Sequence, residues 1–292
     1  MATSPAAGDI WGEDGNPARY GAWARDYPGY RETSRDLVRL TLPLDLPAAS
    51  ASARVLDLAC GTGVTTCEIL AVLGPGGRVT AVDKSAAMLG EAARSVTDPR
   101  VTWVNAAAET LDRQVTGPFA AVLCNSAIWQ TQFAATARAV RAVITAGGRF
   151  AFSVPAGFLG DGNGAGTGTG HRPAERYPSL WSEMRTIAQS DYGWAPPARP
   201  TGRSGQRLSG DSVRRALQDA GFAAPQVTEI SYPASAESEH AWLSIPVFTR
   251  SWLPGLPYED RMRVLNEARA RLGPGHGEQA QWVFFVAWAV VS

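Results

Sequence analysis

The sequence has few residues of the kinds that mark disulfide-rich or metal-binding proteins. Of its 292 residues, only three are cysteine and three are histidine. The cysteines, Cys60, Cys67 and Cys124, form no CxxC pair, so their spacing indicates neither a disulfide framework nor a thiolate metal site. No cluster of histidine and carboxylate residues has ligand spacing, and we expect no bound metal. The sparse cysteines are typical of a reducing setting, and we expect a cytoplasmic location.

An excess of charge of either sign is also lacking. Lys and Arg number 27, as do Asp and Glu, so the formal net charge is zero. No overall field steers such a protein to nucleic acid or to an anionic membrane. The longest apolar run, 283–291, is far shorter than the roughly 20 residues of a membrane-spanning helix. The N-terminus lacks the basic and then apolar regions of a secretory signal, and we expect no nucleic-acid or membrane partner.

What the sequence does contain, from Arg54 onward, is a regular alternation of short apolar runs with segments of helical periodicity. Nearly all-apolar strands separated by helices are typical of a parallel sheet that is covered on both faces, which indicates an α/β fold. Ser85 suits the N-cap of one of these helices. The predicted strands, seven in all, are 54–59, 78–83, 101–104, 119–125, 149–154, 226–232 and 282–292.

Two insertions interrupt this alternation, and we expect one domain over residues 1–292. The segment 157–170 has glycine at seven of its fourteen positions, which is typical of a surface linker or of a mobile lid. Large insertions that cover a pocket favour a small, enclosed substrate. The expected parts are an N-terminal helical lid (1–50), a cofactor-binding core (51–155), a glycine-rich and aromatic insertion (156–207) and a C-terminal part of the sheet (208–292) with a helical insertion (236–279).

The stretch VLDLACGTGVTT, residues 55–66, places glycine at 61 and 63 directly after an apolar strand. Such a turn lets backbone N–H groups approach a ligand, and Asp83, at the end of the next strand, can accept hydrogen bonds from ribose hydroxyls. A dinucleotide-binding turn has a third glycine or alanine where this chain has Thr66. The turn alone leaves two cofactors open, a dinucleotide and S-adenosylmethionine.

Four blocks in order resemble the motifs of the class I S-adenosylmethionine-dependent methyltransferases. They are DLACGTG (57–63), AVDKS (81–85), AAETL (107–111), and FAAVLCNSA (119–127) with AGGRFAFSVP (146–155). The resemblance spans roughly residues 50–155. It implies S-adenosylmethionine as cofactor and a doubly wound, seven-stranded, mostly parallel sheet of the Rossmann-like methyltransferase fold, with an N-terminal helical lid. The chain departs from the family in having Ala59 where glycine is frequent and Ala107 where an adenine-contacting aspartate is frequent.

The resemblance also implies which residues contact the cofactor. Asp57 would lie near the amino group of the methionine moiety, and Asp83 would hold the ribose hydroxyls. The expected cofactor-binding residues are Asp57, Ala59, Gly61, Gly63, Asp83, Lys84, Ala108, Glu109, Asn125 and Ser126.

Methyl transfer from a sulfonium is an in-line displacement, so alignment of the two reactants supplies most of the acceleration and a base is optional. If the acceptor is a hydroxyl or a carbon, His171 and His240 are the candidate catalytic residues. Tyr20, Tyr27, Trp129 and Trp181 are candidate substrate-binding residues, because flat rings suit a planar or apolar acceptor.

The sequence therefore favours a methyltransferase that acts on a small, aromatic or apolar acceptor in specialised metabolism, with a homodimer allowed. Three alternatives stay open. The bound cofactor serves a non-methylating reaction such as a cyclisation, the fold carries a dinucleotide-dependent oxidoreductase, or the chain is a catalytically silent cofactor-binding module.

Overall fold

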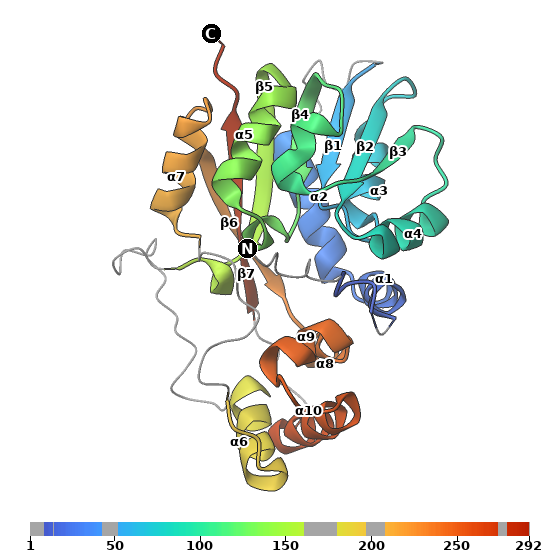
Figure 1. The fold of residues 1–292 in the computed structure, drawn as a ribbon, viewed down its shortest axis with the longest axis vertical. Helices are drawn as coiled ribbons and strands as arrows, with labels where there is room; N and C mark the ends of the chain where they lie inside the picture. Colours follow the sequence, from blue (N-terminus) through green and yellow to red (C-terminus); the bar gives the residue numbers. More distant parts are fainter. Residues whose placement is uncertain are drawn as a thin grey trace, which may run out of the picture.

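The computed structural model describes residues 9–13, 15–42, 52–160, 180–196, 208–273 and 279–291. A single seven-stranded sheet with the order β3-β2-β1-β4-β5-β7-β6 lies at its centre (Figure 1). The strands are β1 (Arg54–Leu58), β2 (Arg78–Asp83), β3 (Val101–Asn105), β4 (Phe119–Cys124), β5 (Ile144–Pro155), β6 (Gln226–Pro233) and β7 (Gln279–Trp288).

The strand directions confirm the predicted fold class. Strands β1 to β5 pair in parallel, and β7 runs antiparallel between β5 and β6. The seven predicted runs correspond to these strands. β5 begins at Ile144, five residues before the predicted start, and its pairing with β4 has a register shift there. The pattern of apolar residues did not indicate this first part of β5, because it contains the polar Thr145 and the glycine pair Gly147 and Gly148.

Helices cover both faces of the sheet, as the apolar strands predict. The α-helices are α1 (Asn16–Asp26), α2 (Gly29–Thr41), α3 (Val64–Val72), α4 (Ala86–Ser95), α5 (Phe133–Val143), α6 (Leu180–Tyr192), α7 (Gly210–Asp219), α8 (Ala236–Leu243), α9 (Pro246–Trp252) and α10 (Tyr258–Leu272). Within the described residues, the short 3-10 helices are η2 (Ala108–Arg113), η3 (Ile128–Gln130) and η4 (Ala156–Phe158).

The core divides along the sheet because successive side chains of a strand point to opposite faces. Phe150 and Phe152 of β5 pack with α5 and α7 on one face. Phe284 of β7 packs with Leu37 of α2 and Ile69 of α3 on the other face. Helices α2 and α3 are also joined by salt bridges from α2 to the carboxylate of Glu68. The second helix of the N-terminal lid is therefore fixed to the sheet.

The helices α6, α8, α9 and α10 gather beyond one end of the sheet (Figure 1). Met184 and Ile187 of α6 and Leu265 of α10 belong to a hydrophobic cluster of their own. The predicted helical insertion, 236–279, contains three helices because Pro246 starts α9 and Pro257 precedes α10, and proline interrupts the hydrogen-bond ladder of a helix. None of the described helices combines the length and the apolar character needed to cross a membrane.

Candidate functional site

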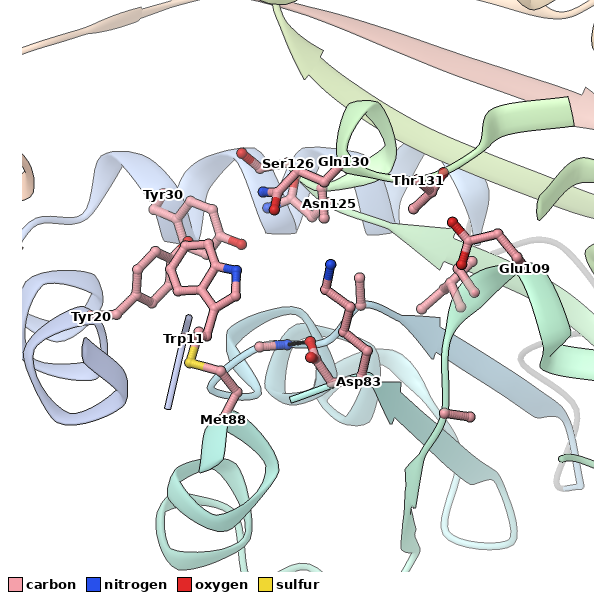
Figure 2. A pocket seen from close by; sticks show the side chains of 17 residues that line it. Trp11, Tyr20, Tyr30, Asp83, Met88, Glu109, Asn125, Ser126, Gln130 and Thr131 are labelled. Atoms are coloured by element: carbon pink, nitrogen blue, oxygen red, sulfur yellow. Dashed lines mark hydrogen bonds between the residues drawn. The ribbon is translucent and has the colours of Figure 1, made fainter. Parts of the chain in front are cut away.

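A pocket lies at the carboxyl ends of β1, β2, β3 and β4 (Figure 2). This is the point where the strand order reverses between β1 and β4, and in open α/β sheets ligands bind in the crevice at such a point. Nine of the residues predicted from the sequence line the pocket: Tyr20, Ala59, Gly61, Asp83, Lys84, Ala108, Glu109, Asn125 and Ser126.

The turn after β1 is built around three backbone positions with positive φ. Gly61 has φ of 55° and Gly63, the N-cap of α3, has φ of 86°. Ala59 also has φ of 54°, which is costly for a residue with a Cβ. A Cβ on Gly63 would come within 3.2 Å of Val96 Cγ2. Gly63 does not line the pocket, and the glycine at this position allows α3 to pack closely on its neighbours.

The carboxylate of Asp83 is fixed at the end of β2 by two backbone donors. Gly61 N–H donates to Oδ2 at 2.9 Å, and Ser85 N–H donates to Oδ1 at 2.8 Å. The residue is buried, and burial raises the pKa of its carboxyl group. Each carboxylate oxygen retains a lone pair, and the pair of oxygens suits two adjacent hydroxyl groups.

Asp57 lies on β1 behind the turn and does not line the pocket. Thr66 Oγ1 donates a 2.6 Å hydrogen bond to its Oδ2, whereas Oδ1 is buried with no partner among the described residues. Burial raises the pKa of Asp57 to about 7. Thr66 stands at the position of the third glycine of a dinucleotide-binding turn, and here its side chain is committed to Asp57.

A buried network of hydrogen bonds holds the pocket residues that follow β4. The amide of Asn125 donates to Ser34 Oγ of α2 at 2.9 Å and to Thr33 Oγ1 at 3.2 Å. Ser153 Oγ of β5 donates to Asn125 Oδ1 and accepts the Ser126 N–H at 3.1 Å. Ser126 has φ of 55°, so the network stabilises a strained backbone at the wall of the pocket.

Ala108 and Glu109 line the end of the pocket next to β3. Ala108 is buried at the start of η2, and Glu109 accepts a hydrogen bond from Gln132 N–H at 2.8 Å. Ala107 offers no side-chain acceptor to a ligand at this end. Lys84, which is exposed, is the single cationic side chain among the described residues that line the pocket.

The N-terminal segment and helices α1 and α2 close the opposite side, where Figure 2 shows Trp11, Tyr20 and Tyr30 together. Asp9 Oδ2 accepts a 2.6 Å hydrogen bond from Ser85 Oγ, which joins this segment to the residue that caps α4. The described part of the segment 1–50 therefore contains two helices beside the pocket, and their role as a lid stays a prediction.

Eight pocket residues were absent from the predicted set. For two of them, Trp11 and Tyr30, the sequence carried a signal in the crowding of aromatic residues before the first strand. The other six residues reach the pocket through the position of the backbone, and no motif or pattern in the sequence marked them. The eight residues are Trp11, Tyr30, Leu58, Met88, Ala106, Ala127, Gln130 and Thr131.

Four of the predicted residues lie outside the pocket and make other contacts. Tyr27 caps the C-terminus of α1, and Trp129 stacks on Phe158 at a centroid distance of 4.7 Å. Trp181 of α6 stacks on Trp252 at 3.6 Å, and His240 Nε2 is hydrogen-bonded to Asn266 Oδ1 at 2.8 Å.

None of these four residues lines the pocket. His171, the other candidate catalytic residue, lies outside the described residues. Within the described ranges, no group of three or more histidine, cysteine, aspartate and glutamate residues is placed to hold a metal ion.

Part of the chain resembles known proteins in sequence. Residues 55–148 match the sequence family described as "Methyltransferase domain". A curated trans-aconitate 2-methyltransferase from Paracidovorax citrulli is 43% identical over 79 residues, which are 27% of this chain and 26% of that protein. The match therefore spans about a quarter of the curated relative.

Two solved structures have a similar fold. The phosphoethanolamine N-methyltransferase 2 of Haemonchus contortus, in complex with S-adenosyl-L-methionine, superposes with a TM-score of 0.58 at 15% identity. The superposition covers 97% of this chain and 60% of that one. The [4+2]-cyclase SpnF superposes with a TM-score of 0.50 at 15% identity and covers 88% of this chain and 80% of that one. At these identities the likeness lies in the fold.

Proposed function

We propose that this chain, whose residues 55–148 match the family described as "Methyltransferase domain", is a class I S-adenosylmethionine-dependent methyltransferase and transfers a methyl group from S-adenosylmethionine to a small acceptor. The observation that carries the proposal is the carboxylate of Asp83. It lines the pocket at the end of β2 and is held by the Gly61 and Ser85 N–H groups.

The pocket residues fit this cofactor. Asp83 supplies two carboxylate oxygens to a ribose, and the buried Ala108 offers a small apolar side chain to a flat ring. Asp57 has a buried Oδ1 without a partner behind the glycine turn, which suits a nearby cationic amino group. Thr66, in the place of a third glycine, disfavours a dinucleotide pyrophosphate.

S-adenosylmethionine supplies, when bound, an electrophilic methyl carbon on a positively charged sulfur. The chain's own residues bind and orient the reactants: Asp83 and the glycine turn fix one end of the ligand, and Asn125 and Ser126 fix the wall beside its reacting end. Alignment of two bound reactants is worth about 7–11 kcal/mol of a barrier in well-oriented reactions. The lid of α1 and α2 excludes water from the aligned pair.

We further propose that the acceptor is small and aromatic or apolar and belongs to specialised metabolism. The support is the aromatic side of the pocket, formed by Trp11, Tyr20 and Tyr30, since flat rings bury a large area against a flat or apolar partner. The curated relative has the name trans-aconitate 2-methyltransferase. We therefore include small carboxylic acids among the acceptors to be tested. A single domain and a cytoplasmic location complete the proposal.

A second function of the same site is a non-methylating reaction such as a cyclisation. The observation that favours it is the similar fold of a structure whose name is that of a cyclase. In that case the chain binds S-adenosylmethionine but forms no S-adenosylhomocysteine.

Release of S-adenosylhomocysteine tests the proposal. The purified chain is incubated with S-adenosylmethionine and a panel of small phenols, amines and carboxylic acids, and the product is quantified by chromatography. We expect acceptor-dependent S-adenosylhomocysteine, which is lost in Asp83→Ala and retained in Asp98→Asn, a half-buried carboxylate that is paired with Arg100 and does not line the pocket. Consumption of an acceptor without S-adenosylhomocysteine would favour the non-methylating reaction instead.

A further inference from the structure

Three aromatic side chains form one wall of the pocket, and we call them the aromatic corner: Trp11, Tyr20 and Tyr30. All three line the pocket, and Figure 2 shows them on the side opposite Glu109 and Thr131. Each is only half-buried, so part of its ring is left open. Rings that served core packing alone would be enclosed on all sides.

The rings of the aromatic corner stand nearly at right angles to one another. Trp11 and Tyr20 have an interplanar angle of 90° with centroids 6.0 Å apart. Tyr20 and Tyr30 have an angle of 83° with centroids 5.7 Å apart. Perpendicular neighbouring rings present both a face and an edge to the space between them, which is the geometry of adjacent walls of an aromatic cage.

Other aromatic residues hold this arrangement from behind. Trp23 packs on Tyr20 and on Tyr30 with centroid distances of 5.4 and 5.5 Å, and Phe248 of α9 packs on Trp11 at 5.6 Å. Trp23 Nε1 donates to Ser238 O of α8 at 3.1 Å. Because α1, α2, α8 and α9 all contribute, the corner is preorganised before a ligand binds.

The charges around the corner favour a cation. The carboxyl groups of Asp83 and Glu109 line the pocket against one ammonium, that of Lys84, and Asp57 lies behind the turn. The pKa of Tyr20 is raised by burial and by the proximity of Asp83, and the pKa of Tyr30 is raised by burial and by Tyr20 and Asp57. Both phenols are therefore neutral at pH 7, and the corner presents π faces to a pocket that is lined by two carboxyl groups and one ammonium.

We propose that the aromatic corner of Trp11, Tyr20 and Tyr30 is a binding site for a methylated onium cation. The positive charge on such a group is spread over its methyl groups, which contact ring faces closely and attract the ring quadrupole. The inference deepens the proposed function and rests on it. Two sources carry this chemistry, the sulfonium of the cofactor and the ammonium of an amine acceptor.

The first arm of the test compares S-adenosylmethionine with S-adenosylhomocysteine, which lacks the methyl group and the charge. The dissociation constants of both are measured by calorimetry for the unmodified chain, Tyr20→Phe and Tyr20→Leu. If the sulfonium is the ligand, Tyr20→Leu weakens S-adenosylmethionine about tenfold more than S-adenosylhomocysteine, because the aliphatic side chain has no quadrupole. Tyr20→Phe keeps the ring and leaves the ratio unchanged.

The second arm tests an ammonium ligand. The chain is saturated with S-adenosylhomocysteine and titrated with tetramethylammonium. The neutral reference ligand is tert-butanol, which is similar in shape and soluble in water. If the acceptor's ammonium is the ligand, tetramethylammonium binds at least tenfold more tightly than tert-butanol, and Trp11→Leu abolishes the difference. This arm uses the unmodified chain first, so it does not depend on whether a variant folds.

A matched control is Trp242→Leu, since Trp242 stacks on Phe248 at 4.1 Å in the same aromatic group but does not line the pocket. We expect it to leave both comparisons unchanged. The inference is overturned if Tyr20→Leu alters the two cofactor forms equally and tetramethylammonium binds no better than tert-butanol. In that outcome S-adenosylhomocysteine still binds and the proposed function stands. Failure of both cofactor forms to bind would overturn the proposed function itself.

Discussion

The hydroxyl of Thr66 donates a 2.6 Å hydrogen bond to Oδ2 of Asp57, which joins the first turn of α3 to the carboxylate of β1. Thr66 stands at the position where a dinucleotide-binding turn has its third glycine or alanine. The hydrogen bond leaves Asp57 Oδ1 buried without a partner among the described residues. The residue at position 66 thus bears on the choice between the two cofactor classes. Burial of Asp57 raises the pKa of its carboxyl group to about 7, so its charge state changes near neutral pH.

Substitution Asp57→Asn will flatten the pH dependence of stability. Burial raises the pKa of Asp57 from 3.8 to about 7 in the folded chain, so ionisation is disfavoured there. The stability from the protonated group is fully present below pH 4 and is lost as the pH rises towards 7 and above. The shift corresponds to at most about 4 kcal/mol. Asparagine keeps an oxygen for Thr66 and cannot ionise.

The measurement is urea unfolding of the cofactor-free chain and of Asp57→Asn at pH 5 and pH 8. Comparing the two proteins at each pH removes contributions from other groups, such as Asp83. We expect the variant to gain stability relative to the unmodified chain between pH 5 and pH 8. Parallel pH profiles would show that Asp57 is already ionised in the folded chain.

Substitution Asp83→Asn will weaken the binding of S-adenosylmethionine and of S-adenosylhomocysteine alike. An asparagine amide turns a donor towards Gly61 N–H or Ser85 N–H, and it offers one acceptor fewer to a ribose. Hydrogen bonds to charged groups contribute about 1.5–3 kcal/mol, so we expect roughly a tenfold to hundredfold loss of affinity. Calorimetry measures both ligands, and Asp98→Asn is the control with an unchanged dissociation constant. Equal affinity in Asp83→Asn would contradict the role given to this carboxylate.

Substitution Ala59→Gly will stabilise the chain. Ala59 has φ of 54°, where a Cβ costs roughly 1–2 kcal/mol, and glycine adopts this conformation freely. The extra freedom of glycine in the unfolded chain offsets about half of this gain, so we expect a net increase of about 0.5–1 kcal/mol. Ala216→Gly, in the interior of α7, is the matched control and should lose about 1 kcal/mol. Thermal unfolding compares the two, and a loss of stability at Ala59 would show that its methyl group is needed.

Substitution Ser153→Ala will damage the wall of the pocket from behind. It removes the acceptor of Ser126 N–H and the donor to Asn125 Oδ1, so two buried polar groups lose a partner. We expect a loss of roughly 2–4 kcal/mol in the free energy of unfolding, together with weaker cofactor binding. Ser251→Ala is the control because its exposed hydroxyl bonds only to Phe248 O. Unfolding in urea gives the first quantity and calorimetry the second, and a neutral Ser153→Ala would mean that water replaces the hydroxyl.

The sequence predicted the sheet well because most of its strands are apolar over most of their length and several of their ends carry a turn or cap signal. The Ser85 cap is one such signal, and the structure confirms it with a hydrogen bond from Met88 N–H. The early start of β5 at Ile144 escaped prediction, since its residues resemble a turn. Helices α8 and α9 were expected as part of one helical segment, and they are separate because Pro246 starts α9.

The cofactor side of the pocket was predictable because a glycine turn and a strand end fix their own side chains locally. Gly61 and Asp83 meet in the structure as the motifs imply. The opposite side of the pocket depends on how segments that are distant in the sequence pack together, and local sequence patterns do not predict such packing. Trp11 and Tyr30 line the pocket because the N-terminal segment packs against it. Trp181 does not line the pocket and stacks on Trp252.

Calorimetric titration of S-adenosylmethionine, and separately of NAD, into the unmodified chain tests the central claim most directly. We predict one S-adenosylmethionine bound per chain, with a dissociation constant on the order of micromolar, and no saturable binding of NAD at the same concentrations. Tight binding of NAD without binding of S-adenosylmethionine would contradict the assignment of the site and every role derived from it.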